Sequence, residues 1–176
     1  MKKKLIAKIA ALVVLIATVL SLFLESLDWQ TTEIIRYGEP AYYYSYNPFG
    51  LGRSVVYGEE LYNRFYFYGV DLIPGILTIM GSIYVLISKK KGDLFGFGII
   101  ALGILTFLIL IWFSWSFEVG ESVKSIVKNP YWSQGIAQGV EYNLHLGVGF
   151  FLVLGGATIG IMGALLERKF NKHNEN

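Results

Sequence analysis

The stretch "GVGFFLVLGGATIGIMGALLERK", residues 147–169, decides the class of fold. Its first part, 147–166, is apolar and carries no charge, and it is followed by Glu167, Arg168 and Lys169. An α-helix needs about 20 apolar residues to cross about 30 Å of hydrocarbon. The stretch therefore predicts a membrane-spanning helix that ends on basic residues at the membrane surface.

Three further apolar runs repeat this pattern along a chain of 176 residues. We expect helices over about 5–27, 72–88 and 94–115, and a fourth over about 143–166. Only 16% of the residues are charged, whereas soluble domains average about 25%. Residues 1–176 are thus predicted to form a single membrane domain of the membrane all-α class, a four-transmembrane-helix bundle.

The first run also imitates a signal peptide, because a basic start precedes its apolar middle. Its apolar part is nearly of membrane length, and no clear small-residue cleavage site ends it. We therefore expect the first run to remain as an uncleaved helix.

The basic residues predict the orientation of this bundle. They gather before the first run, between the second and third runs, and after the fourth: Lys2, Lys3, Lys4 and Lys8; Lys89, Lys90 and Lys91; Arg168, Lys169 and Lys172. Most acidic residues lie in the two longer loops, about 28–71 and 116–142. The positive-inside rule then predicts a multi-pass protein of the cell (plasma) membrane, with both termini cytoplasmic and the two longer loops outside.

The first outer loop changes its period from helix to strand. The segments "TTEIIRYG" and "AYYYSYN" are rich in β-forming residues, and "EP" and "PFGLG" are typical of turns. We expect two to four strands, which form a small extracytoplasmic antiparallel β-sheet in this loop. Alternation then places Tyr42, Tyr44 and Tyr46 on the face toward the bundle, and Tyr43 and Ser45 on the other face.

Three roles remain open for the aromatic residues of the outer loops. They pack the sheet and anchor it at the lipid surface, they form a recognition surface for a protein or a glycan, or a tyrosine takes part in catalysis. The candidate partner-binding residues are Tyr43, Ser45, Phe49, Tyr131 and Trp132.

The fourth helix carries small residues at every fourth position. Gly156, Gly160 and Ala164 form the small-xxx-small pattern that permits close approach of helices. We expect these residues to pack within the bundle, and a dimer interface is the alternative.

The sequence offers little catalytic chemistry. The middles of the four runs contain no Asp, Glu, Lys, Arg or His, the chain has no cysteine, and no hydrolase or nucleotide-binding motif is present. We expect a protein that is not an enzyme and that needs no cofactor and no metal ion. The expected partners are membrane lipids and a protein partner or a second copy of the chain, and we expect no binding to nucleic acid.

Several residues resemble the claudin-like four-span family. Trp29 lies early in the first loop and is followed by Gly50 and Leu51, Arg64 lies near the return to the second helix, and Gly147 lies at the entry into the fourth. The paired loop cysteines of that family and the last Trp of its signature are absent here. The resemblance implies four helices, a β-rich first outer loop, and a role in adhesion, scaffolding or sealing between membranes.

Two functions follow as hypotheses. The first is a non-catalytic four-span integral membrane protein that acts through its aromatic outer loops, as an adhesion or scaffold protein or as an accessory subunit of a membrane complex. The alternative is a small oligomeric channel or transporter component, whose pore is lined by residues such as Thr78, Ser82, Thr106 and Thr158.

Overall fold

The computed structural model describes residues 2–56, 66–67, 72–88, 93–118, 129, 131–137 and 140–173. Within these residues the helices are α1 (Lys2–Leu20), α2 (Leu72–Ile87), α3 (Asp93–Glu118) and α5 (Val148–His173), with a 3₁₀-helix η1 at Glu25–Leu27. The strands are β1 (Gln30–Arg36), β2 (Glu39–Tyr46), β3 (Leu51–Val56), β4 (Tyr66–Phe67), β5 (Trp132–Ala137) and β6 (Val140–Leu146).

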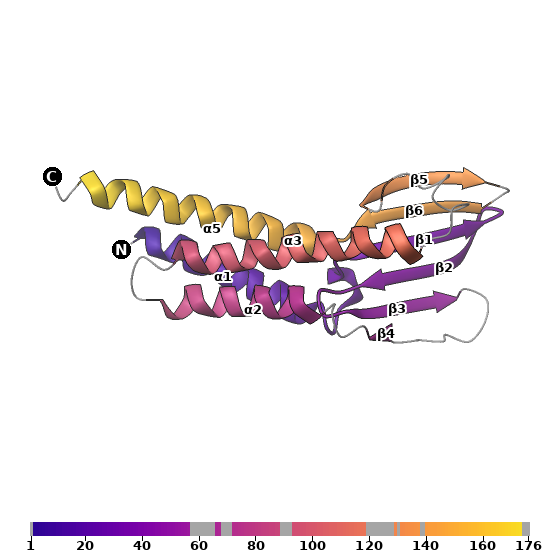
Figure 1. Ribbon diagram of the computed structural model, residues 1–176, viewed down its shortest axis with the longest axis horizontal. Helices are drawn as coiled ribbons and strands as arrows, with labels where there is room; N and C mark the ends of the chain where they lie inside the picture. The colour runs from indigo at the N-terminus through magenta and orange to yellow at the C-terminus, as the bar shows by residue number, and fades with distance from the viewer. Residues whose placement is uncertain are drawn as a thin grey trace.

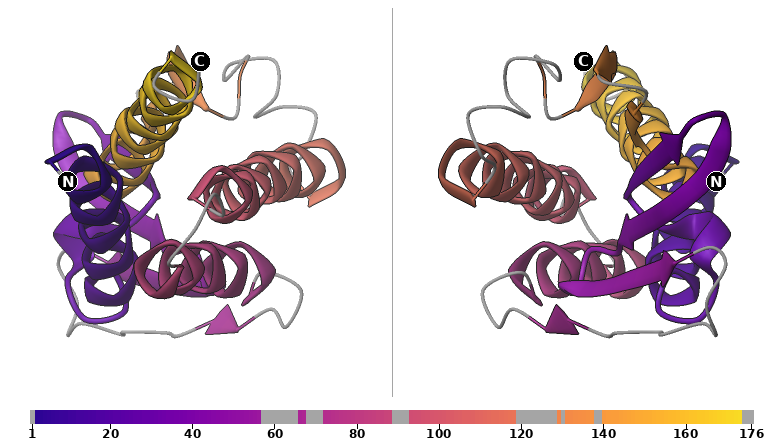
Figure 2. Two further views of the ribbon diagram at one scale, coloured as in Figure 1. Left: turned by 90° about the vertical axis from the view of Figure 1, so that its left-hand side faces the viewer. Right: turned by 90° about the vertical axis from the view of Figure 1, so that its right-hand side faces the viewer.

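The helices lie side by side in a bundle, and the strands continue from one end of it (Figure 1). α1 begins and α5 ends at the opposite end of the bundle (Figure 1). Viewed along the bundle, α1 lies beside α5 and α2, and α3 lies beside α2 and α5 (Figure 2). The N-terminal and C-terminal helices are therefore neighbours.

Within the described residues, two helical segments are long and apolar enough to cross a membrane: Leu94–Phe113 and Val148–Glu167. The apolar segments Leu5–Leu20 and Leu72–Ile87 are shorter. These properties concern length and composition alone.

Glycines bring α2 and α3 into contact through their backbones. A Cβ atom added to Gly81 would lie 2.6 Å from the carbonyl oxygen of Gly96, and one added to Gly103 would lie 2.8 Å from the carbonyl oxygen of Pro74. Because both distances are too short for a side chain, only glycine allows the two helices to lie this close together.

The structure corrects the bounds of two predicted helices. The helix expected over 5–27 ends at Leu20, and the one expected over 143–166 begins at Val148 and continues to His173. The residues just before Val148 belong to β6, because they pair with β1 along its whole length. This pairing overrides the local apolar signal. The other two helices follow the prediction closely, since α2 covers Leu72–Ile87 and α3 covers Asp93–Glu118.

The sheet is antiparallel, and among the described residues its strands follow the order β4-β3-β2-β1-β6-β5. The sheet that was predicted within residues 28–71 therefore also includes β5 and β6, which lie between α3 and α5. The turn between β1 and β2 is made by Tyr37 and Gly38, both with positive φ, as in a type I′ hairpin. The predicted turn at Glu39 and Pro40 is instead the start of β2, where the register with β1 shifts.

Trp29 joins the bundle to the sheet. Its side chain is fully buried, and its ring makes edge contacts with Phe107 of α3 and Phe150 of α5 at centroid distances of 4.9 and 5.8 Å. Its backbone N–H donates to Tyr46 O, and its carbonyl accepts from the N–H of Gly147. A single residue thus contacts two helices and binds the ends of β2 and β6.

Candidate interaction surface

The register of the strands assigns each residue to one of two faces. Directly paired residues in an antiparallel sheet share a face. One face, called here the outer face, carries Thr31, Glu33 and Ile35 of β1, Tyr43 and Ser45 of β2, Trp132, Gln134 and Ile136 of β5, and Glu141, Asn143 and His145 of β6. The opposite face, called here the tyrosine face, carries Tyr46 with Thr32, Leu144 and Leu146.

The tyrosine face is the one turned toward the bundle and α3. The sheet curves around one side of the long axis, and the end of α3 lies across from it (Figure 2). Leu146 packs against the buried core, and Tyr131, which precedes β5 beside Leu146, reaches α3. Tyr43 and Ser45 lie on the other face by their register. The side chains of Tyr42 and Tyr44 lie outside the described part of the structure, so their predicted direction stays a prediction.

Tyr131 is anchored to α3. Its hydroxyl donates a hydrogen bond to the carbonyl oxygen of Leu108 at 2.9 Å, and its ring stacks on Trp112 with a centroid distance of 6.5 Å. Burial raises the pKa of the Tyr131 hydroxyl above its ordinary value of 10.0, because desolvation disfavours the phenolate. This predicted partner-binding residue therefore has an internal contact already.

Two other predicted partner-binding residues are buried, and their assignment to an accessible surface is corrected. Ser45 is 0% exposed, and Phe49 is 7% exposed. Phe49 packs against Gly75 of α2, where the N–H of Gly75 donates to Pro48 O at 2.7 Å. The β2–β3 turn thus lies on the outer end of α2, which buries the ring that the sequence assigned to a partner.

Trp132 is accessible, as the sequence predicts for a partner-binding residue. Its side chain is 64% exposed, and its ring makes an edge contact with His145 at a centroid distance of 6.1 Å. The Thr31 hydroxyl lies 2.9 Å from Nε2 of His145. Tyr43, the remaining candidate, is half-buried on the same face, opposite Glu33.

Sequence reasoning missed two accessible residues of β5. Gln134 and Ile136 lie on the outer face with Trp132, and Ile136 is 75% exposed. The residues Trp132 to Ile136 do not alternate regularly between apolar and polar, so the sequence offered no clear strand signal here. The second loop was therefore not assigned to strands.

The residues that carry the family resemblance lie mostly at the junction of bundle and sheet. Trp29 and Gly147 are joined by a backbone hydrogen bond of 2.8 Å. Gly50 has a φ of 70°, which favours glycine, and precedes Leu51 at the start of β3. Arg64 lies outside the described residues.

The small residues of α5 lie inside the bundle, but they do not face one neighbour. A Cβ atom on Gly156 would meet Val14 of α1 at 2.6 Å, and one on Gly160 would overlap the ring of Phe97 of α3. Ala164 is buried as well. The predicted small-residue ridge is therefore shared between two neighbouring helices.

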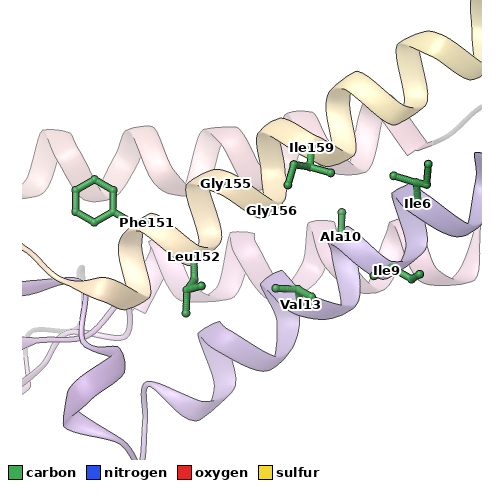
Figure 3. Close-up of a pocket in the computed structure, with 9 residues that line it drawn as sticks. All are labelled: Ile6, Ile9, Ala10, Val13, Phe151, Leu152, Gly155, Gly156 and Ile159. Atoms are coloured by element: carbon green, nitrogen blue, oxygen red, sulfur yellow. The ribbon is translucent and has the colours of Figure 1, made fainter.

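An apolar groove runs between α1 and α5, with a volume of about 370 Å³. Its lining residues are labelled in Figure 3: Ile6, Ile9, Ala10, Val13, Phe151, Leu152, Gly155, Gly156 and Ile159. Gly155 has open space where a side chain would stand. No polar group in the lining gives this groove specificity for a ligand.

The hydroxyl residues proposed to line a pore are not brought together. Thr78 and Ser82 are buried and donate to Pro74 O and Thr78 O within α2. Thr106 and Thr158 donate to carbonyl oxygens of their own helices and lie on accessible faces. Across the residues that the structure describes, no group of three or more His, Cys, Asp or Glu is placed to hold a metal ion.

No protein-family model matches the chain, and the comparison with curated proteins gives no match. The resemblance to the claudin-like family therefore stays a prediction from the sequence.

Proposed function

We propose that this chain is a four-span integral membrane protein without catalytic activity. It acts through its outer loops as an adhesion or scaffold protein, or as an accessory subunit of a membrane complex. The membrane part of the proposal rests on the direction of the large apolar side chains. The partner-binding part rests on the accessible residues of β5 on the outer face, Trp132, Gln134 and Ile136.

Large apolar side chains point away from the bundle on all four described helices. Examples are Ile9 and Ile16 in α1, Met80 and Ile87 in α2, Leu105 and Ile109 in α3, and Ile159 and Met162 in α5. Exposing such surface to water is unfavourable by about 25 cal/mol for each Å². In a lipid bilayer the same surface meets hydrocarbon, and small residues inside the bundle allow helices to pack.

The charged residues fit the same arrangement. The basic residues at the start of α1 and the end of α5 lie at the end of the bundle away from the sheet (Figure 1). Lys8, the charge within the first apolar run, donates from Nζ to the carbonyl oxygen of Leu86 at 3.0 Å. Its ammonium group therefore lies at the C-terminal end of α2, where the helix dipole favours a cation.

A cysteine-labelling experiment tests the four-span arrangement, because the chain has no cysteine of its own. Tyr37→Cys places the probe at the 81% exposed hairpin tip, and Lys169→Cys places it near the end of α5. An impermeant maleimide added to intact cells is expected to label the first variant only. The Lys169→Cys variant is expected to be labelled only after the cells are permeabilised. Labelling of both variants from the same side of the membrane would contradict the proposal.

A further inference from the structure

The two edges of the sheet differ in how well they are protected. β4 spans only Tyr66–Phe67, so that edge is short. β5 spans Trp132–Ala137, contains no charged residue and no proline, and pairs with β6 without a register shift. Proteins protect edge strands with lysines, prolines, bulges or short length, because an open edge pairs with other strands. β5 has none of these protections.

The backbone groups that β5 turns outward can be assigned. The N–H of Leu146 donates to Tyr131 O at 3.1 Å, so the pair of Tyr131 and Leu146 is a hydrogen-bonded one. Hydrogen-bonded pairs alternate along an antiparallel ladder. The N–H and C=O groups of Trp132, Gln134 and Ile136 therefore point away from β6, and among the described residues no strand pairs with that side of β5.

β5 is complementary to itself in one antiparallel register. A two-fold axis perpendicular to the sheet keeps each side chain on its face, so only residues whose numbers are both even or both odd become opposite. Centred on Gln134, such an axis places Trp132 opposite Ile136 of the second copy, and Gln134 opposite Gln134. Aromatic and β-branched pairs of this kind stabilise sheets, and the outward backbone groups of all three residues find partners.

We propose that β5 pairs in this register with β5 of a second copy of the chain, held in an apposed membrane. The strands run in the direction of the bundle (Figure 1). Antiparallel pairing therefore turns the second bundle end over end, which two copies with the same orientation in one membrane cannot achieve. This inference rests on the proposed function, since it needs the bundle to span the membrane.

The second copy is favoured as the partner by the absence of charge in β5 and by the symmetry of the register, whereas the small area of the edge limits the affinity. Self-pairing of β5 brings no like charges together, because the strand has none. Specific, stable interfaces bury about 1,200–2,000 Å² in total, and the edge of a strand this short provides less. Each contact is therefore weak, and adhesion depends on many copies that act together.

The register also sets the distance between the two membranes. Gln134 pairs with Asn143, and α5 begins at Val148. At about 3.3 Å for each residue of a strand, Gln134 lies roughly 17 Å beyond the start of α5, so the α5 helices of the two copies begin roughly 34 Å apart, which sets the spacing of the two membranes.

The test uses the full chain in liposomes of phosphatidylcholine and phosphatidylglycerol, with Trp132→Cys in one population and Ile136→Cys in the other. Mixing the populations under mild oxidation is expected to give a disulfide-linked dimer. Its yield should exceed by about tenfold that of the matched control, Trp132→Cys mixed with Ser133→Cys, whose side chains belong to opposite faces. Electron microscopy should show apposed bilayers at the stated distance.

Three outcomes overturn the inference in distinguishable ways. Vesicles that aggregate without this disulfide show that adhesion occurs through another surface, so the proposed function stands and the inference fails. In a second experiment both variants are placed in the same vesicles, and a polymer brush keeps the vesicles apart. If the same disulfide forms there, β5 pairs within one membrane and the inference fails. Correctly inserted chains with neither aggregation nor disulfide contradict both the inference and the adhesion role.

A backbone variant tests the edge directly. Gln134→Pro removes an N–H that points away from β6, so proline is tolerated at this edge. Thermal unfolding is expected to change little, while vesicle aggregation falls about tenfold relative to Gln134→Thr. Unchanged aggregation by a folded variant would overturn the inference, and if the variant fails to fold, the disulfide yields decide.

Discussion

In the bundle, neighbouring helices approach each other through glycines, whereas at the junction with the sheet large rings fill the interior. Gly81, Gly96, Gly103 and Gly160 all lie where a side chain would collide with a neighbouring helix. Trp29, in contrast, is fully buried between Phe107 and Phe150. Glycines therefore determine how closely the helices approach in the bundle, where rings such as Phe97 are buried as well, whereas large rings fill the junction.

The two regions are therefore destabilised by opposite changes in side-chain size. Enlarging an interior residue separates helices in the bundle, and shortening an interior residue leaves a cavity at the junction. The chain has no cysteine, so no disulfide can attach the sheet to the bundle. The contacts of Trp29 with Phe107 and Phe150 attach it to two helices instead.

The largest effect is expected from shortening Trp29. Trp29→Ala should lower the free energy of unfolding by about 3–5 kcal/mol, because a large buried ring is lost and the cavity does not fill. Chemical unfolding in detergent micelles measures this. Trp29→Phe should cost less, since it keeps a ring against Phe107, and the exposed Trp132→Ala should cost little. Equal losses for Trp29→Ala and Trp132→Ala would mean that the junction does not hold the sheet.

Enlarging Gly160 should have the next largest effect. Gly160→Leu drives a side chain into the ring of Phe97 and should cost about 1–3 kcal/mol. The matched control is Gly155→Leu, because open space lies where its side chain would stand. Thermal unfolding in detergent compares the two variants. If they lose the same stability, the close contact between α5 and α3 is wrong.

The sequence predicted the bundle well because length and charge alone specify an apolar helix. α2 was placed almost to the residue, since its apolar run carries no charge between Asp71 and the basic residues after Ser88. The start of α5 was placed too early because the longer apolar run was extended back over "VEYNLHL", although the alternation of apolar and polar residues in this segment is typical of a strand. Its strand character depends on pairing with β1, more than a hundred positions away in the chain.

The candidate surface was harder to predict than the bundle. Trp132 is accessible, whereas Phe49 is buried because the β2–β3 turn meets the end of α2, and Ser45 is buried within β2. No local pattern reports such a contact. Gln134 and Ile136 were missed because an edge strand is defined by its place in the sheet, and the sequence does not give the strand order.

Tyr131 gives a smaller effect that depends on pH. Its pKa is raised in the folded protein, so the folded state holds the phenolic proton more tightly than the unfolded chain. The associated stability is fully present below about pH 10, the unfolded value, and is lost as the pH rises through the folded-state pKa. Tyr131→Phe also removes the hydrogen bond to Leu108, at a cost of about 0.5–1.5 kcal/mol. The unfolding midpoint of Tyr131→Phe should therefore lie below that of the wild type at pH 8, and this difference should be smaller at pH 11.

Lys8 gives the smallest effect and tests the end of the bundle far from the sheet. Its ammonium group donates to Leu86 O, where the C-terminal end of α2 favours a cation. Lys8→Met keeps a long apolar stem that packs against its neighbours and removes only the charge and the hydrogen bond. We expect a loss of about 0.5–1 kcal/mol, measured by thermal unfolding in detergent. The control is Lys169→Met, because Lys169 is exposed on α5 and its loss should leave stability unchanged. If Lys8→Met is more stable than the wild type, the cost of desolvating the Lys8 ammonium group exceeds the gain from its hydrogen bond to Leu86 O. Apolar packing alone would then hold α1 and α2 together at this end of the bundle.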